Sequence, residues 1–110
     1  VLFRSQPGRP AVLGEYGGNS LRTPGHMYRP DSKCCYHLYD SKEAVTQAYV
    51  DQAARLREYA ATQGLSAAVY TETTDVEEEL NGFLTYDRQV KKLDFDRVTK
   101  ANKALVKFGR

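Results

Sequence analysis

The sequence predicts an α/β fold with parallel strands, and the order of four segments carries this prediction. Two short apolar runs, residues 10–15 and 65–71, are bounded by turn residues and are typical of buried strands. Two longer segments, residues 40–63 and 94–108, have apolar side chains at helical spacing. The order strand, loop, helix, strand, loop, helix indicates two βα units with parallel strands and helices packed outside them. Two such units leave strand edges uncovered, so we expect this unit to be part of a larger fold.

Length and composition restrict the classes of function. The 110 residues suffice for one small domain, and 41% hydrophobic with 27% charged residues is a globular composition. A net charge of +2 creates no strong field for a nucleic acid or an acidic membrane. No apolar run is long enough to cross a bilayer, and the first residues do not form a signal peptide. We therefore expect no nucleic-acid partner and no membrane partner, and the compartment stays open.

The segments between the strands carry recognisable turn and cap signals. Residues 1–9 have no assignable structure, and residues 10–110 form the expected folded unit. The stretch 16–39 is rich in Gly, Pro, Asn, Asp and Ser, and so long a loop indicates a functional role. The first helix is predicted to begin with Asp40 as N-cap and Glu43 in a capping box, and to end before Gly64.

Glu15 is the first candidate for chemistry, because catalytic groups of parallel α/β folds lie where strands end. It closes the first apolar run directly before a Gly-Gly turn. A carboxylate in that position costs free energy unless it is hydrogen-bonded or needed for its charge. The alternative is a glutamate that caps the turn or pairs with an arginine such as Arg22.

The acidic loop 72–81 is the second candidate. Its oxygen-rich side chains suit calcium, but their spacing does not match an EF-hand. A capped turn followed by a solvated acidic run is the favoured interpretation. The basic residues near the C-terminus are interleaved with acids and indicate the solvated face of a helix; they are Lys91, Lys92, Arg97, Lys100, Lys103 and Lys107.

Metal and thiol chemistry are disfavoured, and the tyrosines leave two alternatives open. His26, Cys34, Cys35 and His37 do not have the paired spacing of a structural zinc site. A cysteine nucleophile needs a spatial partner that the sequence does not identify. Five tyrosines either belong to the core or form a stacking platform for sugar rings; they are Tyr16, Tyr28, Tyr36, Tyr39 and Tyr49.

Two motifs resemble a known enzyme family. The string Gly-Glu-Tyr-Gly-Gly covers residues 14–18, and the longer string Gly-Leu-Ser-Ala-Ala-Val-Tyr-Thr-Glu-Thr-Thr-Asp-Val-Glu covers residues 64–77. The likeness continues through residues 79–88 and covers most of residues 10–108. Together they resemble family 2 glycoside hydrolases, which include β-galactosidase-like and β-glucuronidase-like enzymes. The bacterial branch with sugar-binding domains is the most similar.

The resemblance implies a fold, a reaction and a site. The chain is expected to be the C-terminal part of a (β/α)8 TIM barrel, its last two βα units, with Glu15 as nucleophile at the seventh strand. The general acid/base of the family belongs to an Asn-Glu pair upstream of this segment, so the 110 residues alone are expected to be inactive. Expected partners are a carbohydrate substrate and the rest of the parent barrel, and no cofactor is required. The implied substrate-binding residues are Tyr16, His26, Tyr70, Glu72 and Asp75.

This sequence departs from the family pattern at several positions. Glu72 replaces a more usual glutamine, Tyr28 replaces a tryptophan, and Cys34-Cys35-Tyr36 replaces a string such as Asn-Trp-Gly. The main prediction is a fragment of a retaining β-glycosidase. The alternatives are a non-catalytic carbohydrate-binding relative and a standalone interaction module. The sugar, the linkage and the oligomeric state are left open.

Overall fold

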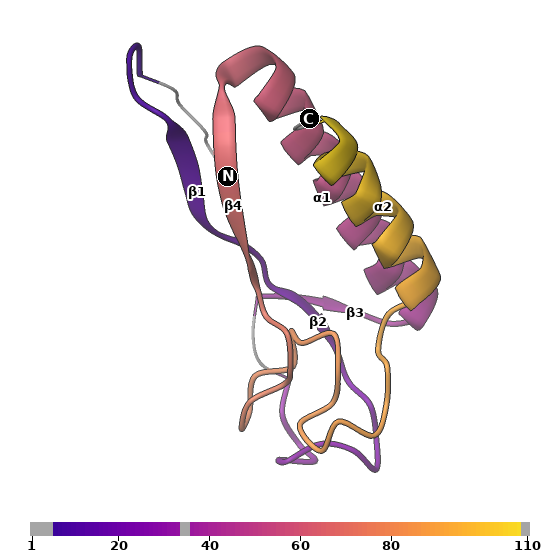
Figure 1. Ribbon diagram of the computed structural model, residues 1–110. Helices are drawn as coiled ribbons and strands as arrows, with labels where there is room; N and C mark the ends of the chain where they lie inside the picture. Colours follow the sequence, from indigo (N-terminus) through magenta and orange to yellow (C-terminus); the bar gives the residue numbers. More distant parts are fainter. Residues whose placement is uncertain (1–5, 34–35, 109–110) are drawn as a thin grey trace.

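The computed structural model describes residues 6–33 and 36–108 and shows two helices beside two small sheets (Figure 1). The molecule is elongated, with extents of 48 × 25 × 20 Å. Loops from residues 22–33 and 72–94 gather at the end toward which both long strands run (Figure 1). The elements are β1 (Ala11–Gly17), β2 (Asn19–Leu21), β3 (His37–Tyr39), α1 (Lys42–Gln63), β4 (Leu65–Thr71) and α2 (Phe95–Phe108).

The two long strands pair as the sequence predicts. β1 and β4 are parallel neighbours, with Ala11 opposite Leu65 and Gly17 opposite Thr71. The bounds of β4 match the predicted strand over residues 65–71. The expected run of residues 10–15 corresponds to β1, which extends to Gly17. Parallel pairing of the two apolar runs is therefore confirmed.

The β1–β4 pair contains a bulge near the end of β1. The register shifts between the Leu13–Ala68 pair and the Tyr16–Tyr70 pair. Over this interval β1 has two residues where β4 has one. Bulges of this kind bend a strand and change the direction of its side chains. The bulge therefore changes which way the side chains in the last part of β1 point.

The predicted TIM-barrel fragment is wrong. A barrel needs strands joined in one closing sheet with helices around its outside. Here β1 pairs with β4, whereas β2 pairs in parallel with β3 in a second two-stranded sheet. The physical reason is the short connection after β1: β2 begins after a single residue, Gly18, and turns away from β4. The fold is a small α/β structure with two helices and two short parallel strand pairs.

Two glycines make this turn sterically possible. Gly17 and Gly18 have φ angles of 107° and 65°, which favour glycine. A Cβ on Gly17 would lie 2.6 Å from the ring of Tyr70, and one on Gly18 would lie 2.6 Å from Tyr36. Backbone geometry and packing thus both require glycine where the chain passes from one sheet to the other.

The caps of α1 confirm one prediction and correct another. Gly64 adopts the left-handed conformation, with φ of 70°, and its N–H donates to the carbonyl of Tyr59. The N-cap is Ser41, not Asp40 as predicted, because the Ser41 Oγ accepts from the Ala44 N–H at 3.0 Å. Glu43 does not close a capping box but pairs with an arginine of α2.

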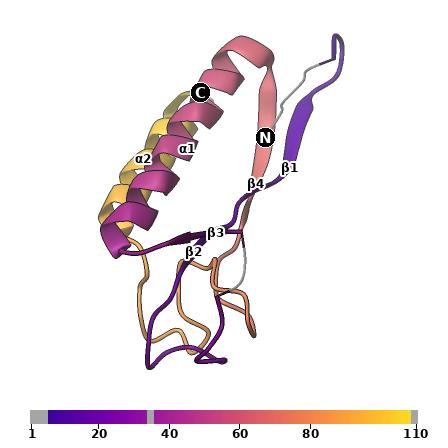
Figure 2. The ribbon, with the colours of Figure 1, turned by 180° about the vertical axis from the view of Figure 1, so that it is seen from behind.

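The hydrophobic core lies where the helices meet the loops. Val45 and Tyr49 of α1 pack with Leu93, which precedes α2, and with Val98 in the first turns of α2. The hydroxyl of Tyr49 donates to Asn102 of α2 at 2.5 Å, which ties the two helices together. Figure 2 shows the second sheet, β2–β3, beside the N-terminal end of α1. The core therefore stabilises the loop end of the molecule.

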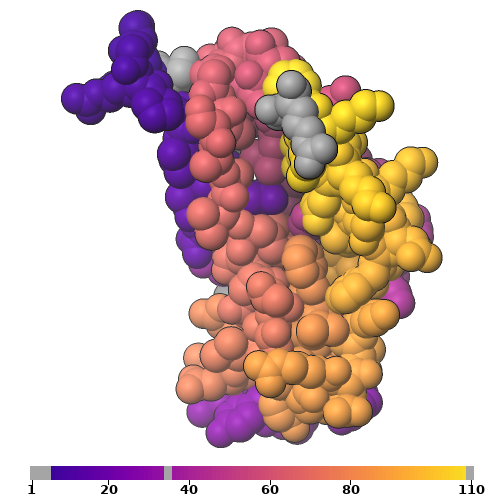
Figure 3. Space-filling model, viewed as in Figure 1, coloured from indigo at the N-terminus to yellow at the C-terminus, as the bar shows by residue number. Residues whose placement is uncertain are grey.

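The β1–β4 sheet is poorly covered by comparison. Val12 and Val69 are 59% and 56% exposed. In Figure 3 the two helices leave the upper part of β4 open in the space-filling view. Neither described helix combines the length and apolar composition needed to span a bilayer.

This distribution predicts unequal protection from hydrogen exchange. Amides of α1 between Val45 and Leu56 are expected to exchange more slowly than those of β4 between Ser66 and Val69. The helix buries one face in the core, whereas the strand has one hydrogen-bonded neighbour and exposed side chains. Hydrogen–deuterium exchange followed by NMR or mass spectrometry measures the difference. Equal or greater protection of β4 would contradict the expected location of the stable core.

Candidate functional site

Glu15 lies within the bulge of β1 and is exposed to solvent. Within residues 6–33 and 36–108, no hydrogen bond or ion pair engages its carboxylate. Arg22, the expected alternative partner, instead donates to the carbonyls of Ser32 at 3.0 Å and Pro30 at 2.8 Å. The structure therefore leaves the Glu15 carboxylate available at the end of β1.

Tyr16 and Tyr70, two of the expected substrate contacts, belong to one aromatic cluster. Their rings meet edge to face with centroids 5.2 Å apart. Tyr70 also stacks on Phe83, at 4.7 Å and 10°. Its hydroxyl accepts from Asn19 at 3.1 Å, and burial raises the pKa of Tyr70 to about 12. Tyr70 is thus a packing residue of this cluster, whereas Tyr16 is the neighbour of Glu15 in the sequence.

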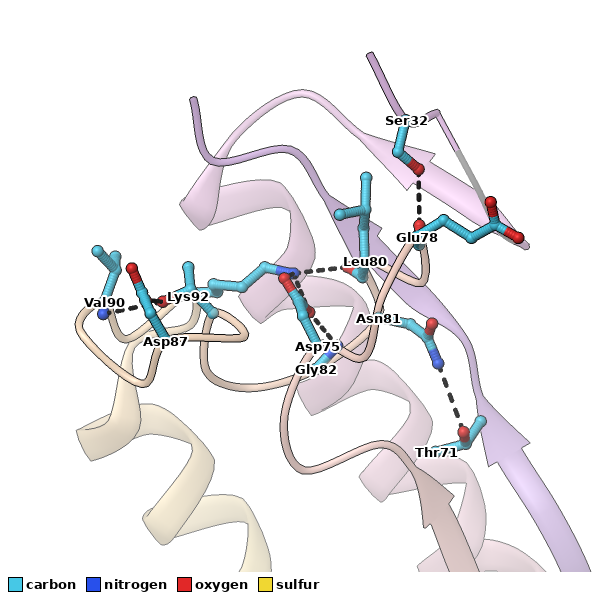
Figure 4. A network of polar contacts seen from close by, with 11 residues as sticks. Ser32, Thr71, Asp75, Glu78, Leu80, Asn81, Gly82, Asp87, Val90 and Lys92 are labelled. Carbon is cyan, nitrogen blue, oxygen red and sulfur yellow. Dashed lines mark hydrogen bonds and ion pairs between the residues drawn. The ribbon is translucent and has the colours of Figure 1, made fainter. Parts of the chain in front are cut away.

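A buried ion pair organises the loop that follows β4 (Figure 4). The Lys92 side chain is fully buried, and its Nζ donates to both oxygens of Asp75, at 2.7 and 2.9 Å. It also donates to the carbonyl of Leu80 at 2.6 Å. These bonds use the three donors of an ammonium group. Asp75 accepts a further bond from the Gly82 N–H at 2.8 Å.

The ion pair fixes the backbone closely around it. A Cβ on Gly82 would lie 2.3 Å from the Asp75 nitrogen, so only glycine fits there. Burial raises the pKa of Asp75 and lowers that of Lys92, while the contact between the two groups opposes both shifts. Asp75 was expected to face the substrate; the structure places it in this pair, with 4% of its surface exposed. Its observed contacts are structural.

Glu72 is a carboxyl group whose pKa is raised by its surroundings. It follows β4 directly, and its backbone N–H donates to the Asn81 carbonyl at 3.1 Å. One carboxyl oxygen, Oε1, is buried without a hydrogen-bond partner in the described structure. Burial, and then repulsion from Glu79 and Asp75, raises the pKa of Glu72 from 4.5 to about 7. Glu72 is consequently a proton-holding group near neutral pH.

His26 and Asp87 join two loops that are 61 residues apart in sequence. Their contact runs from Nδ1 of His26 to Oδ2 of Asp87, at 2.8 Å. The other Asp87 oxygen accepts from Thr85 Oγ1 at 2.5 Å and from the Gln89 N–H at 3.1 Å. These bonds, chiefly those from Thr85 and His26, lower the pKa of Asp87 to about 2. His26 is therefore held by a carboxylate that stays ionised.

Sequence reasoning missed Lys92, Asn81 and Asp87 as organising residues. Lys92 was assigned to the solvated face of a helix, but it precedes α2 and is buried. The available signal was its place between Val90 and Leu93, outside the helical pattern. Asp87 had no sequence signal, because its partner His26 comes from a distant loop.

The remaining metal and cavity candidates do not form a site. Across the part of the chain that the structure describes, no three His, Cys, Asp or Glu side chains are placed to hold a metal ion. The zinc and thiol hypotheses depend on Cys34 and Cys35, which lie outside the described residues. A groove of about 820 Å³ lies between α1 and α2 and is lined by alanines, Leu105 and Phe108, with charged side chains such as Arg57 and Lys100 among them. None of the expected site residues lines it.

Comparisons with known proteins do not assign this chain to a family. No protein-family model matches the chain, and no curated protein matches it. The assignment of a function therefore depends on the residues and contacts described above.

Replacing Lys92 by methionine tests the buried ion pair. We expect Lys92→Met to lower the free energy of unfolding by about 3–5 kcal/mol, since it leaves the Asp75 carboxylate buried and unpaired. Urea denaturation followed by circular dichroism measures the change. Lys103→Met, at an exposed position of α2, is the matched control and is expected to change stability by less than about 0.5 kcal/mol. Equal effects of the two substitutions would show that the ion pair does not organise the loop.

Glu72 predicts a pH dependence of stability. A carboxyl group whose pKa is higher in the folded state binds more protons there, so its favourable contribution is lost as the pH rises from 4.5 to about 7. We expect the stability of the original chain relative to Glu72→Gln to fall across this window and to level off above it. Thermal unfolding of both proteins between pH 4 and pH 8 measures the difference. A difference that is constant, or that grows with pH, contradicts the proton-holding role.

Proposed function

We propose that this chain supplies the nucleophile of a retaining β-glycosidase and that the nucleophile is Glu15. The observation that carries the proposal is the state of this side chain: an exposed carboxylate in a bulge, with no ion pair or hydrogen bond among the described residues. Bulges occur preferentially beside active sites, where they aim a side chain. The resemblance of residues 14–18 and 64–77 to family 2 glycoside hydrolases supports the same assignment.

The reaction proceeds by two displacements. The Glu15 carboxylate attacks C1 of the sugar and forms a glycosyl ester while a second carboxyl group protonates the leaving oxygen. Water, deprotonated by that second group, then attacks C1 and releases Glu15. The two carboxyl groups of retaining enzymes lie about 5–5.5 Å apart. Neither step requires a cofactor.

The second carboxyl group is proposed to come from another part of the protein. In the family that the sequence resembles, it belongs to an Asn-Glu pair, and this sequence contains no such pair. Glu72 holds a proton near neutral pH, but its carboxyl group faces Glu79, Asp75 and Lys92. We therefore assign Glu72 to the wall of the site, with Tyr16, and not to proton transfer. The isolated 110 residues are accordingly proposed to be inactive.

The exchange of Glu15 for glutamine tests the proposal in the complete protein. Glutamine keeps the size of the side chain but cannot form the glycosyl ester, so turnover of an aryl β-glycoside is expected to fall by at least about 10⁴-fold. Glu58→Gln, at an exposed position of α1, is the matched control and is expected to leave turnover unchanged.

Covalent labelling identifies the nucleophile directly. A 2-deoxy-2-fluoro glycoside with an activated leaving group is expected to label Glu15, as read by peptide mass spectrometry. Label on another residue, or near-normal turnover by Glu15→Gln, ends the assignment. Retained sugar binding without label or turnover would instead favour the non-catalytic carbohydrate-binding relative.

A further inference from the structure

Two tyrosines from distant loops form an exposed pair next to His26 and Asp87. Tyr28 and Tyr86 meet edge to face, with ring centroids 5.7 Å apart and planes at 79°. They are 59% and 40% exposed, although both are large aromatic side chains. Each is close in sequence to one member of the His26–Asp87 contact. The two loops therefore present two aromatic rings and a polar pair together.

The loops that carry this pair are rigidly connected. The turn before Tyr28 is closed by a bond from the His26 N–H to the Thr23 carbonyl at 3.0 Å. The turn around Tyr86 is closed by a bond from the Arg88 N–H to the Thr85 carbonyl at 2.8 Å. The His26–Asp87 contact then joins one turn to the other. The two turns that carry the rings are consequently joined before any ligand arrives, which lowers the entropic cost of binding.

The polar groups have a defined hydrogen-bonding capacity. An ionised Asp87 only accepts hydrogen bonds, so Nδ1 of His26 carries the proton in their contact. In the neutral ring, Nε2 is then an acceptor, and the His26 side chain is 37% exposed. No described residue engages Nε2. The site thus offers Nε2 of the imidazole and two phenol hydroxyls as polar groups for a ligand.

We propose that Tyr28 and Tyr86, together with His26, bind a pyranose ring of a glycan. A pyranose has apolar C–H faces and hydroxyl groups around its edge. Ligand sites in proteins combine aromatic walls with a few placed polar groups in the same way. Tyrosine supplies a rigid ring and a hydroxyl at low entropic cost. The inference rests on the proposed function for the ligand class alone, because the geometry of the pair does not involve Glu15.

The probe for this subsite is a set of methyl β-D-pyranosides, the glucoside and the galactoside, titrated into the 110-residue chain. NMR signals of the Tyr28 and Tyr86 rings are expected to shift with saturation. Sorbitol, an acyclic polyol with similar hydroxyls but no ring face, is the control ligand and is expected to leave these signals unchanged. Absence of any shift at saturating pyranoside, or an equal shift with sorbitol, overturns the proposal.

Substitutions separate stacking from a structural role of the rings. Tyr86→Ala is expected to weaken pyranoside binding about tenfold, whereas Tyr28→Trp, with its larger face, is expected to strengthen it. Tyr36→Asn is the matched control at an exposed tyrosine; asparagine suits the positive φ of that position. If Tyr28→Trp leaves binding unchanged, or Tyr36→Asn weakens it as much as Tyr86→Ala, the subsite is rejected.

The variant Glu15→Gln keeps the two proposals apart. It is expected to leave pyranoside binding at the tyrosine pair unchanged while the complete protein loses turnover. Loss of turnover with no binding at the pair would refute the subsite alone. Binding at the pair with full turnover by Glu15→Gln would refute the nucleophile alone.

Discussion

The buried contact between Lys92 and Asp75 is the interaction on which the loop end of this protein depends. Lys92 contributes its ammonium to Asp75 and to the Leu80 carbonyl, and its backbone N–H to the Phe83 carbonyl at 2.8 Å. One residue therefore holds three separate points of the segment between β4 and α2. The segment also forms backbone hydrogen bonds of its own, such as that from the Asp75 N–H to the Leu84 carbonyl at 2.9 Å. The buried charged pair joins these turns at one centre.

The position of Phe83 links this polar centre to the hydrophobic core. Phe83 stacks on Tyr70 at the end of β4 and meets Tyr49 of α1 edge to face, with centroids 5.3 Å apart. The segment between β4 and α2 is thus held by two kinds of contact: the Lys92–Asp75 ion pair and the packing of Phe83. The candidate groups Glu72 and Asp87 sit on this segment. The positions of Glu72 and Asp87 are therefore fixed by contacts within this segment. The strand β4 determines only where the segment begins.

Local patterns in the sequence predicted the elements but not their assembly. β4, the Gly64 cap and the parallel pairing of β1 with β4 follow from an apolar run, a glycine and the order of segments. The separation into two sheets does not, because β2 and β3 have three residues each and lie inside a stretch dominated by turn residues. Contacts between residues far apart in the sequence, such as His26 with Asp87, produce no periodic pattern from which they could be predicted. Glu15 and Tyr16 are candidates from a local motif in the sequence, whereas the contacts of Lys92 and Tyr86 are visible only in the folded chain.

The bulge in β1 has a consequence for sequence change in this segment. Side chains of a strand alternate between two faces, so one extra residue inverts the alternation for everything beyond it. The register also shifts between Ala11 and Val12, where the extra residue lies in β4, so the seven residues of β1 lie opposite seven residues of β4 overall. Deleting Gly14 would remove this balance. Insertions and deletions of one residue here are thus not neutral adjustments of length: they exchange the inner and outer surfaces of the strand. A substitution at Glu15 changes the chemical group at this position, whereas a change in the number of residues before it changes the direction of the side chain.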